Sequence, residues 1–272
     1  MDDLEMLRYM FDLQGYLVIK DVLSSQEVAA LNALIDAQNL PEPGKIRRFG
    51  GAAGGAPEGP GFLEWGQPFC DLLDHPCIML ILRFMLGDSF RLDRIYGMYM
   101  RDGMKLGRMH GSNTPYSPGE YYHVRDGRIH NGFTVVTWNL ADTGPEYGGF
   151  CCVPGSHKSN FKLPKQVYDD PERYPCVVLP EAPAGSVTMF SEALTHGTAA
   201  WRGKHERRSL LYKYCQSQVA WGSGRVRPPT TVELTPRQQI LFREPANPGN
   251  FFPSLFDAEL LDAELLDEKA AD

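Results

Sequence analysis

The sequence predicts a mainly β (α+β) fold, a jelly roll or related barrel with a helical cover at its N-terminus. Three observations favour this fold. With 43% apolar and 11% aromatic residues among 272, the chain can bury a core without disulfides. Apolar residues near the N-terminus have helical spacing, whereas short apolar runs separated by Gly, Pro, Asn and Asp fill the stretch from Phe90 to Cys215. We expect a single domain over residues 1–272 with its barrel core at about 90–217.

The N-terminal segment predicts a helix, a strand and a second helix. Apolar residues from Leu4 to Leu13 recur with helical spacing, and Gly15 stands where a left-handed residue would end that helix. The run Tyr16–Val22 is short and β-branched. Ser24-Ser25-Gln26-Glu27 then forms a capping box in front of the next helical pattern.

Residues 40–66 predict a long loop, because Gly and Pro replace any periodicity there. A loop of this length is either a functional lid or a loose connection. Four of its side chains are suited to holding a ligand: Arg47, Arg48, Phe62 and Trp65.

Alternating or mixed apolar patterns predict the barrel strands that follow, and the C-terminal tail at 255–272 is acidic. The strands are expected at Arg94–Met100, Gly132–Leu140, Phe150–Val153, Ser186–Phe190 and Arg208–Tyr214. In the tail, the repeat Asp-Ala-Glu-Leu-Leu at 257–261 and 262–266 predicts an amphipathic helix. That helix would be a packing arm, a dimer contact or a solvated end.

Composition and motifs exclude several classes of protein. A net charge of −7 without a basic stripe argues against a nucleic-acid partner. No apolar run approaches the ~20 residues needed to cross a bilayer, and no signal-peptide pattern opens the chain, so we expect a cytoplasmic protein without a membrane anchor. The six cysteines show no Cys-x-x-Cys spacing and are expected to be reduced core residues. Nucleotide-binding glycine motifs and a Ser-His-Asp pattern are also missing.

Two histidines and an arginine pair are the first candidates for a site. His110 and His196 each end an apparent strand and precede an irregular segment, so they could converge on one metal ion or simply pack by hydrogen bonding. Arg207 and Arg208 start a strand-like run, and strand alternation points one of them inward. A buried guanidinium needs an anion, and the carboxylate of a small dicarboxylic acid suits it. An ordinary surface pair is the alternative.

Three motifs in order carry a family resemblance. They are residues 15–24, the turn Gly148–Lys158 with its Pro-Gly-Ser-His, and His196-Gly197-Thr198 followed by Arg207. Together they resemble the phytanoyl-CoA dioxygenase family of iron(II)- and 2-oxoglutarate-dependent oxygenases. The resemblance covers roughly Phe11 to Gln216.

The resemblance implies a double-stranded β-helix core and a cofactor set of iron(II), 2-oxoglutarate and O2. It implies that His110 and His196 bind the iron and that Arg207 binds the distal carboxylate of 2-oxoglutarate. Thr198 would assist Arg207, and Trp138 would line the cosubstrate pocket. His157, in the turn, is read as structural.

One position departs from the family pattern. The family places an aspartate two residues after its first histidine, whereas this chain has Ser112 there. A neutral hydroxyl is a poor iron ligand, so four explanations are open. Water or a halide fills the position, as in related iron halogenases; Asp126 or Glu192 substitutes for the missing acid; His123 replaces His110 and pairs with Asp126; or the site binds metal poorly and serves another role.

Glu192 is the more difficult of the two substitute acids to place. It shares strand parity with His196, but four residues of extended strand would separate the two by ~13 Å. It can share an ion with His196 only if the strand bends.

We therefore expect an oxygenase that hydroxylates a small organic substrate. A halogenase that uses the position of Ser112, and a non-catalytic binding protein on the same barrel, are the alternatives. Aromatic side chains after the first motif form a pocket wall or fill a surface turn: Tyr116, Tyr121 and Tyr122. The identity of the substrate and the oligomeric state do not follow from the sequence.

Overall fold

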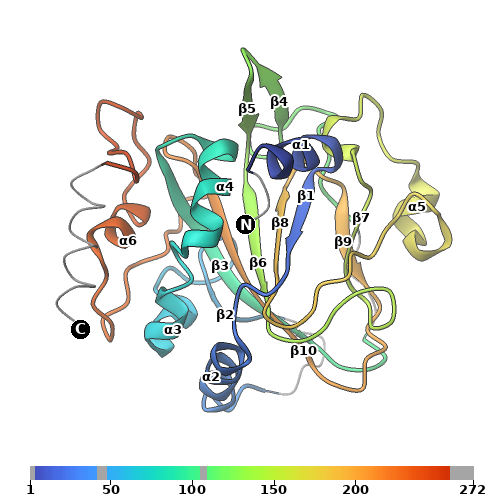
Figure 1. Ribbon diagram of the computed structural model, residues 1–272, viewed down its shortest axis with the longest axis horizontal. Helices are drawn as coiled ribbons and strands as arrows, with labels where there is room; N and C mark the ends of the chain where they lie inside the picture. Colours follow the sequence, from blue (N-terminus) through green and yellow to red (C-terminus); the bar gives the residue numbers. More distant parts are fainter. Residues whose placement is uncertain (1–3, 42–47, 105–108, 258–272) are drawn as a thin grey trace.

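A computed structural model describes residues 4–41, 48–104 and 109–257 of the chain (Figure 1). The strands are β1 (Tyr16–Ile19), β2 (Arg48–Ala52), β3 (Phe90–Met100), β4 (Tyr122–Arg125), β5 (Arg128–Asn131), β6 (Thr134–Asn139), β7 (Gly149–Cys152), β8 (Val187–Ser191), β9 (His196–Ala199) and β10 (Arg207–Gln216). The α-helices are α1 (Leu4–Gln14), α2 (Ser25–Asp36), α3 (Gln67–Cys70), α4 (Pro76–Leu86), α5 (Lys165–Asp169) and α6 (Pro236–Leu241). Short 3-10 helices lie at η1 (Gly61–Trp65), η2 (Ser156–Lys158) and η3 (Pro171–Arg173).

A six-stranded antiparallel sheet forms the centre of the fold, in the order β1-β8-β6-β10-β3-β2. A two-stranded sheet, β7-β9, lies beside it, and the hairpin β4-β5 projects from one end (Figure 1). Helices α3, α4 and α6 cover the side of the main sheet away from β7 and β9 (Figure 1). The chain thus has two sheets packed as a jelly-roll core, with helices over one of them.

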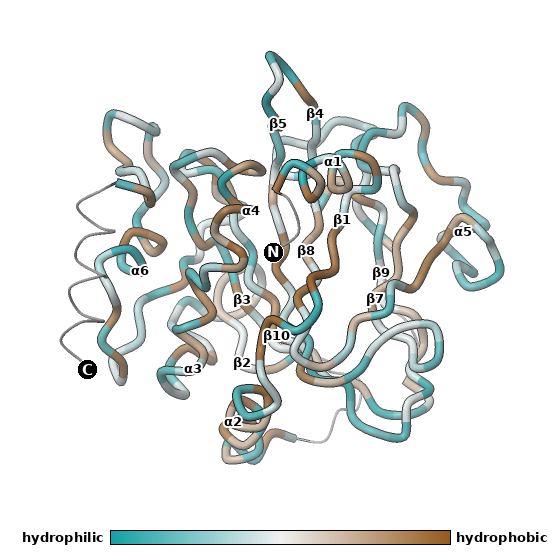
Figure 2. The backbone as a smooth tube through the Cα atoms, viewed as in Figure 1, coloured by the Kyte–Doolittle hydropathy of each residue, from teal (hydrophilic) through white to brown (hydrophobic). Residues whose placement is uncertain are grey.

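Strand alternation divides the main sheet into two faces. On β10, Leu210 and Tyr212 belong to the larger hydrophobic core that includes the helices, which we call the outer face. Leu211 belongs to a smaller core that includes Tyr96 of β3 and Phe150 of β7, which we call the inner face. Figure 2 shows hydrophobic stretches in β1 and α4, which these cores bury. The inner face, between the two sheets, is where polar side chains of a barrel site would converge.

The predicted N-terminal elements and barrel strands are confirmed within a few residues. The first helix ends at Gln14, next to Gly15 with φ of 84°, and Ser24 and Glu27 form the predicted capping box of α2. Each of the five expected barrel strands overlaps β3, β6, β7, β8 or β10. In the part of the chain that the structure describes, no helix is long and apolar enough to cross a membrane. The predicted C-terminal helix falls mostly in 258–272, outside the described residues.

The prediction of a long loop over residues 40–66 is wrong for two segments of it. This stretch contains β2, which pairs with β3, and η1. Phe49 causes the difference, because its ring enters the core and stacks on Trp65 with the centroids 6.0 Å apart. Gly97 of β3 makes room for it, since a Cβ there would lie 2.1 Å from the Phe49 ring. Phe62 is fully buried beside them, and Arg47 lies outside the described residues.

Candidate metal centre

His110 and His196 lie side by side across an antiparallel bridge. Each backbone N–H donates to the other's carbonyl at 2.8 Å, and the ring centroids are 4.2 Å apart. Nδ1 of His196 lies 2.7 Å from the carbonyl oxygen of Leu194, which can only accept, so Nδ1 carries the proton. Nε2 of His196 is then the lone-pair nitrogen, the form in which imidazole binds a metal.

Glu192 joins the two histidines because the chain turns between β8 and β9. The backbone N–H of Leu194 donates to the carbonyl of Ser191 at 2.9 Å, and Glu192 N–H donates to the carbonyl of Phe133 at 2.8 Å. The residues after Ser191 therefore fold back and do not continue as a strand. As a result, ligand atoms of His110, Glu192 and His196 lie within 4.8 Å of one another. The chain bends here, which is the condition under which Glu192 and His196 can share an ion.

The electrostatics of the cluster keep these side chains in the states that bind metal. Burial by itself would raise the pKa of Glu192. Lys213 and the two imidazoles outweigh this effect and bring the pKa down to about 2. Burial, with His110 nearby, lowers the pKa of His196 to about 3. At neutral pH the cluster therefore offers a carboxylate and a neutral imidazole, as divalent metal binding requires. His110 is exposed, whereas the other two are buried, so the cluster lies where the core meets the surface.

Lys213 of β10 is the buried counter-ion of Glu192. Its ammonium contacts the Glu192 carboxylate, and both side chains are more than nine-tenths buried. Such a pair is costly to break, because removing one partner leaves the other as an uncompensated charge in the core. A metal ion at the cluster would supply a second positive charge for the same carboxylate.

This arrangement predicts how Lys213→Met responds to metal. Without metal, we expect the variant to lose about 3–5 kcal/mol of unfolding free energy, because Glu192 loses its counter-ion. Nickel(II) should recover much of this loss, so the nickel-induced rise in Tm should be larger than in the wild type. Calorimetric melts in EDTA and in excess nickel measure both values. The exposed Lys165→Met is the control, and an equal nickel effect in wild type and Lys213→Met would show that Glu192 is not at the metal.

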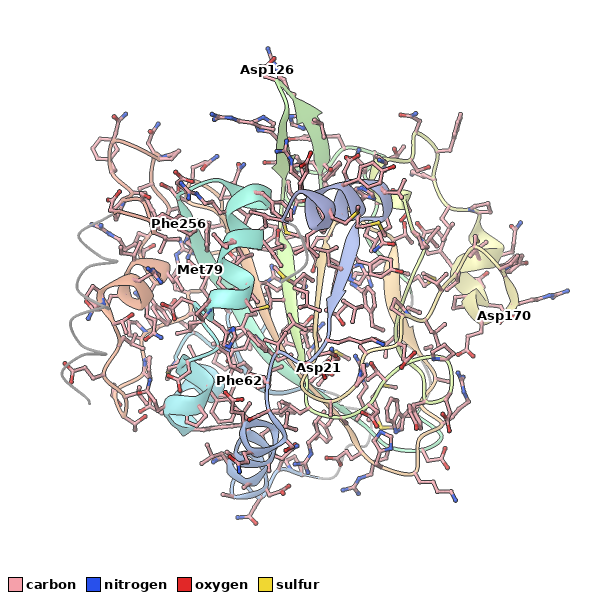
Figure 3. The ribbon with its side chains drawn as sticks, in the orientation of Figure 1. Asp21, Phe62, Met79, Asp126, Asp170 and Phe256 are labelled. Atoms are coloured by element: carbon pink, nitrogen blue, oxygen red, sulfur yellow. The ribbon has the colours of Figure 1, made fainter. Side chains whose placement is uncertain are left out.

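Ser112, Asp126 and His123 are not brought to the cluster. The Ser112 hydroxyl donates to the carbonyl of Thr114 at 2.8 Å and accepts from its N–H at 3.0 Å, which makes it part of a turn. Asp126 lies at the tip of the β4-β5 hairpin with its side chain 90% exposed (Figure 3). His123 stacks on His130 within the same hairpin. Neither Asp126 as a substitute acid nor His123 in place of His110 fits the structure.

Arg207 lies on the inner face and Arg208 on the outer face, as strand alternation predicts. Arg208 pairs with Asp36 and Glu206 at 2.7 Å each. Arg207 is 3% exposed, burial lowers its pKa to about 10, and Nη1 donates to the sulfur of Met100 at 3.4 Å. Among the described residues no carboxylate pairs with it, and its Nε has no hydrogen-bond partner.

Ser209 lies two residues further along β10, on the same face as Arg207. Its hydroxyl is also buried without a partner among the described residues. Two orphaned polar groups with a common direction and one positive charge fit the carboxylate of a bound acid. Sequence reasoning missed Ser209, although the spacing Arg-x-Ser in a strand places both side chains on one face.

Comparison with known proteins agrees with this geometry. A family model described as Phytanoyl-CoA dioxygenase (PhyH) matches residues 11–209. The chain belongs to the phytanoyl-CoA dioxygenase family. Members of this family are non-haem iron oxygenases that use 2-oxoglutarate.

Individual relatives are distant but extensive. Ectoine dioxygenase from Sphingopyxis alaskensis is 25% identical over 222 residues, which is 69% of this chain and 68% of that protein. The structure of HygX from Streptomyces hygroscopicus with nickel and 2-oxoglutarate has a TM-score of 0.68 and 23% identity, covering 80% of this chain and 93% of HygX. The structure of EctD from S. alaskensis without ligands has a TM-score of 0.57 and 22% identity, covering 84% of this chain and 80% of EctD. These structural matches establish the jelly-roll fold.

The phytanoyl-CoA dioxygenase resemblance implied roles at the cosubstrate for two further residues, Thr198 and Trp138. The two lie in different parts of the fold. Thr198 pairs with Phe150 and shares its face of β9 with His196, two residues away. Trp138 pairs with Leu210 of β10, so it lies on the outer face, in the larger core, with its ring 5.4 Å from His75. Trp138 therefore does not face Arg207. The residues of β6 on the inner face with Arg207 are Val135, Thr137 and Asn139.

The remaining candidates divide into structural and surface residues. The hydroxyl of Tyr122 donates to Asp12 of α1 at 2.6 Å, and Nε2 of His157 lies 3.0 Å from the Asp12 carbonyl. Burial lowers the pKa of His157 to about 4, so its neutral ring is part of the core, consistent with the structural role assigned to it. Tyr116 is exposed and lies 5.9 Å from the ring of Tyr121.

Proposed function

We propose that this protein is an iron(II)- and 2-oxoglutarate-dependent hydroxylase in which His110, Glu192 and His196 hold the iron. The observation that carries the proposal is the convergence of their ligand atoms within 4.8 Å. Two neutral imidazoles and one carboxylate are the donors by which non-haem oxygenases bind iron(II) while other positions stay open. Glu192 would thus do from the β8–β9 turn what the family's aspartate does from the position of Ser112.

The cosubstrate would be held at its far end by Arg207. Arg207 and Ser209 fit the distal carboxylate of 2-oxoglutarate because that carboxylate would satisfy both of their unpartnered atoms. Thr198, on the strand that starts with His196, would assist. Phe190 and Phe150 pack against the His196 ring at 4.5 and 6.2 Å and exclude water from that side. Iron, 2-oxoglutarate and O2 supply the oxidising chemistry when bound, and the chain supplies binding, orientation and a dry wall.

Hydroxylation is favoured over halogenation because a carboxylate is available at the centre. A halide at the iron needs a position that no protein acid fills, and Glu192 is within reach of that position. A small-molecule substrate is supported by the relatives, one named for ectoine and one solved with hygromycin B bound. The non-catalytic binding protein is disfavoured because small-molecule binding alone does not require two imidazoles and a carboxylate to converge.

A reconstitution experiment tests the proposal. We expect the anaerobic protein to bind one iron(II) per chain, to develop a visible charge-transfer band with 2-oxoglutarate, and to convert 2-oxoglutarate to succinate in air. Neither the band nor the rate should change when chloride replaces a non-coordinating anion at constant ionic strength. A chloride-dependent band would favour the halogenase, and failure to bind stoichiometric iron would favour the binding protein.

A further inference from the structure

Arg94 is a second inward-facing arginine, on the strand next to the one that carries Lys213. On β3 it pairs directly with Lys213 of β10, so the two side chains share the inner face. Lys213 in turn contacts Glu192 of the cluster. Lys213 is therefore the side chain that links Arg94 to Glu192, and Arg94 lies six residues along β3 from Met100, the partner of Arg207.

The Arg94 guanidinium is clamped in one orientation. Its Cζ lies 4.5 Å from the centroid of the Trp221 ring on one side. The backbone of Gly54 closes on it from another direction, since a Cβ at Gly54 would lie 2.8 Å from Cζ. Nε lies 3.2 Å from the carboxylate of Asp93, which also accepts a hydrogen bond from the Trp221 backbone N–H at 3.0 Å. Any side chain at position 54 would displace the group.

One edge of this fixed guanidinium is unused. Nη2 of Arg94 is buried and has no hydrogen-bond partner among the described residues. The Arg94 side chain as a whole is 10% exposed, so bulk water has little access to Nη2. An unpaired buried donor on a charged group costs more folding free energy than an unpaired neutral donor. A donor of this kind that is held in a fixed position is therefore a candidate to bind a ligand.

Arg94 has to share the carboxylate that it contacts. Asp93 is shared, because it lies 3.3 Å from Arg91 as well, and Arg91 is 1% exposed. One carboxylate thus serves two guanidinium groups, while Lys213 is neutralised by Glu192. Glu120 interacts with Arg94 electrostatically, but no ion pair or hydrogen bond joins them in the described ranges, and burial raises the Glu120 pKa.

We propose that Arg94 is the subsite that binds an oxyanion group of the substrate, such as a carboxylate, sulfate or phosphate. The inference rests on the proposed oxygenase function and adds the chemical class of its substrate. A substrate anchored through one anionic group to a rigid guanidinium on the inner face would present a defined C–H bond to the metal. Arg94 would then determine specificity without contacting the iron.

Crystals of the nickel(II)- and 2-oxoglutarate-loaded protein soaked in sodium bromide test the subsite with the simplest anion. We expect an anomalous bromide peak within contact distance of Nη2 of Arg94, and no peak there in Arg94→Gln. Bromide peaks elsewhere on the protein without one at Nη2 would overturn the proposal. This test needs no knowledge of the substrate, and its main arm uses the wild-type protein.

Calorimetry with acetate, sulfate and methyl phosphate separates the possible oxyanions. At least one of them should bind the loaded wild-type protein, and Arg94→Gln should weaken that binding by about tenfold or more. Arg94→Lys keeps the charge near Asp93, so its anion affinity should lie between those of the wild type and Arg94→Gln. The exposed Arg128→Gln should bind the anion as the wild type does. None of the three anions binding, or equal binding by Arg94→Gln, would contradict the subsite.

Two further measurements distinguish failure of this inference from failure of the proposed function. The affinity for 2-oxoglutarate should be unchanged in Arg94→Gln, and a large loss would make Arg94 a cosubstrate ligand and overturn the subsite. In Arg207→Met, bromide should still bind at Arg94 although 2-oxoglutarate does not. Retained 2-oxoglutarate binding there would refute the cosubstrate assignment and leave the bromide result to decide the subsite.

Discussion

Replacing Glu192 with glutamine should remove tight iron(II) binding. The amide keeps the size of the side chain but loses the negative charge and the strong oxygen donor, so we expect iron affinity to fall by about 100-fold or more. The change also leaves the buried Lys213 ammonium without its partner, which by itself destabilises the fold. Isothermal titration with iron(II) under anaerobic conditions, or with nickel(II) in air, measures the loss.

The double variant Glu192→Gln/Lys213→Met separates metal binding from stability. Both charges of the buried pair are gone, so the unfolding free energy should recover toward the wild-type value, while metal affinity stays low. Asp126→Ala is a second control, because that carboxylate is exposed at the tip of the hairpin and should not affect the metal. Tight iron binding by the double variant would show that Glu192 is not a ligand.

Ser112→Asp tests the same assignment from the family's usual position. With Glu192 in place, an aspartate there would find the metal face complete and would also break the hydrogen bonds between Ser112 and Thr114. We therefore expect no gain in iron affinity. A clear gain would mean that the position is functionally empty and that the halogenase alternative regains support.

The sequence predicted the parts of the site that depend on local pattern. Alternation along one strand separates Arg207 from Arg208, and both end up on opposite faces with different partners. His110 and His196 are brought together by a backbone bridge, although His196 starts β9 and does not end a strand as predicted. These features need only the two-residue period of a strand and the order of motifs.

The features that could not be predicted depend on contacts between distant residues. Glu192 reaches His196 because its N–H bonds to Phe133 and because the hydroxyl of Ser191 accepts from Ala193 at 3.1 Å, and neither contact is visible as a pattern. The face of Trp138 depends on its register with Leu210, which strand propensity does not specify. β2 forms only because Gly97, far along the chain, leaves space for Phe49.

Replacing Arg207 with methionine should abolish 2-oxoglutarate binding and leave iron binding intact. A charge-assisted hydrogen-bonded pair with a buried carboxylate is lost, and we expect the affinity for 2-oxoglutarate to fall by about 100-fold or more. Methionine fills the volume beside Met100, so the core stays packed. Calorimetric titration of the nickel-loaded protein with 2-oxoglutarate measures the change.

The same variant should be more stable than the wild type when no ligand is bound. Arg207 is buried, no carboxylate among the described residues pairs with it, and its Nε is unpartnered, so the ligand-free fold bears the full desolvation cost of a guanidinium. Methionine removes that cost. Arg208→Met is the matched control, because it loses the ion pairs with Asp36 and Glu206 on the outer face and should lower stability slightly without changing the affinity for 2-oxoglutarate. If Arg208→Met lost 2-oxoglutarate and Arg207→Met kept it, the two faces of β10 would have been assigned the wrong way round.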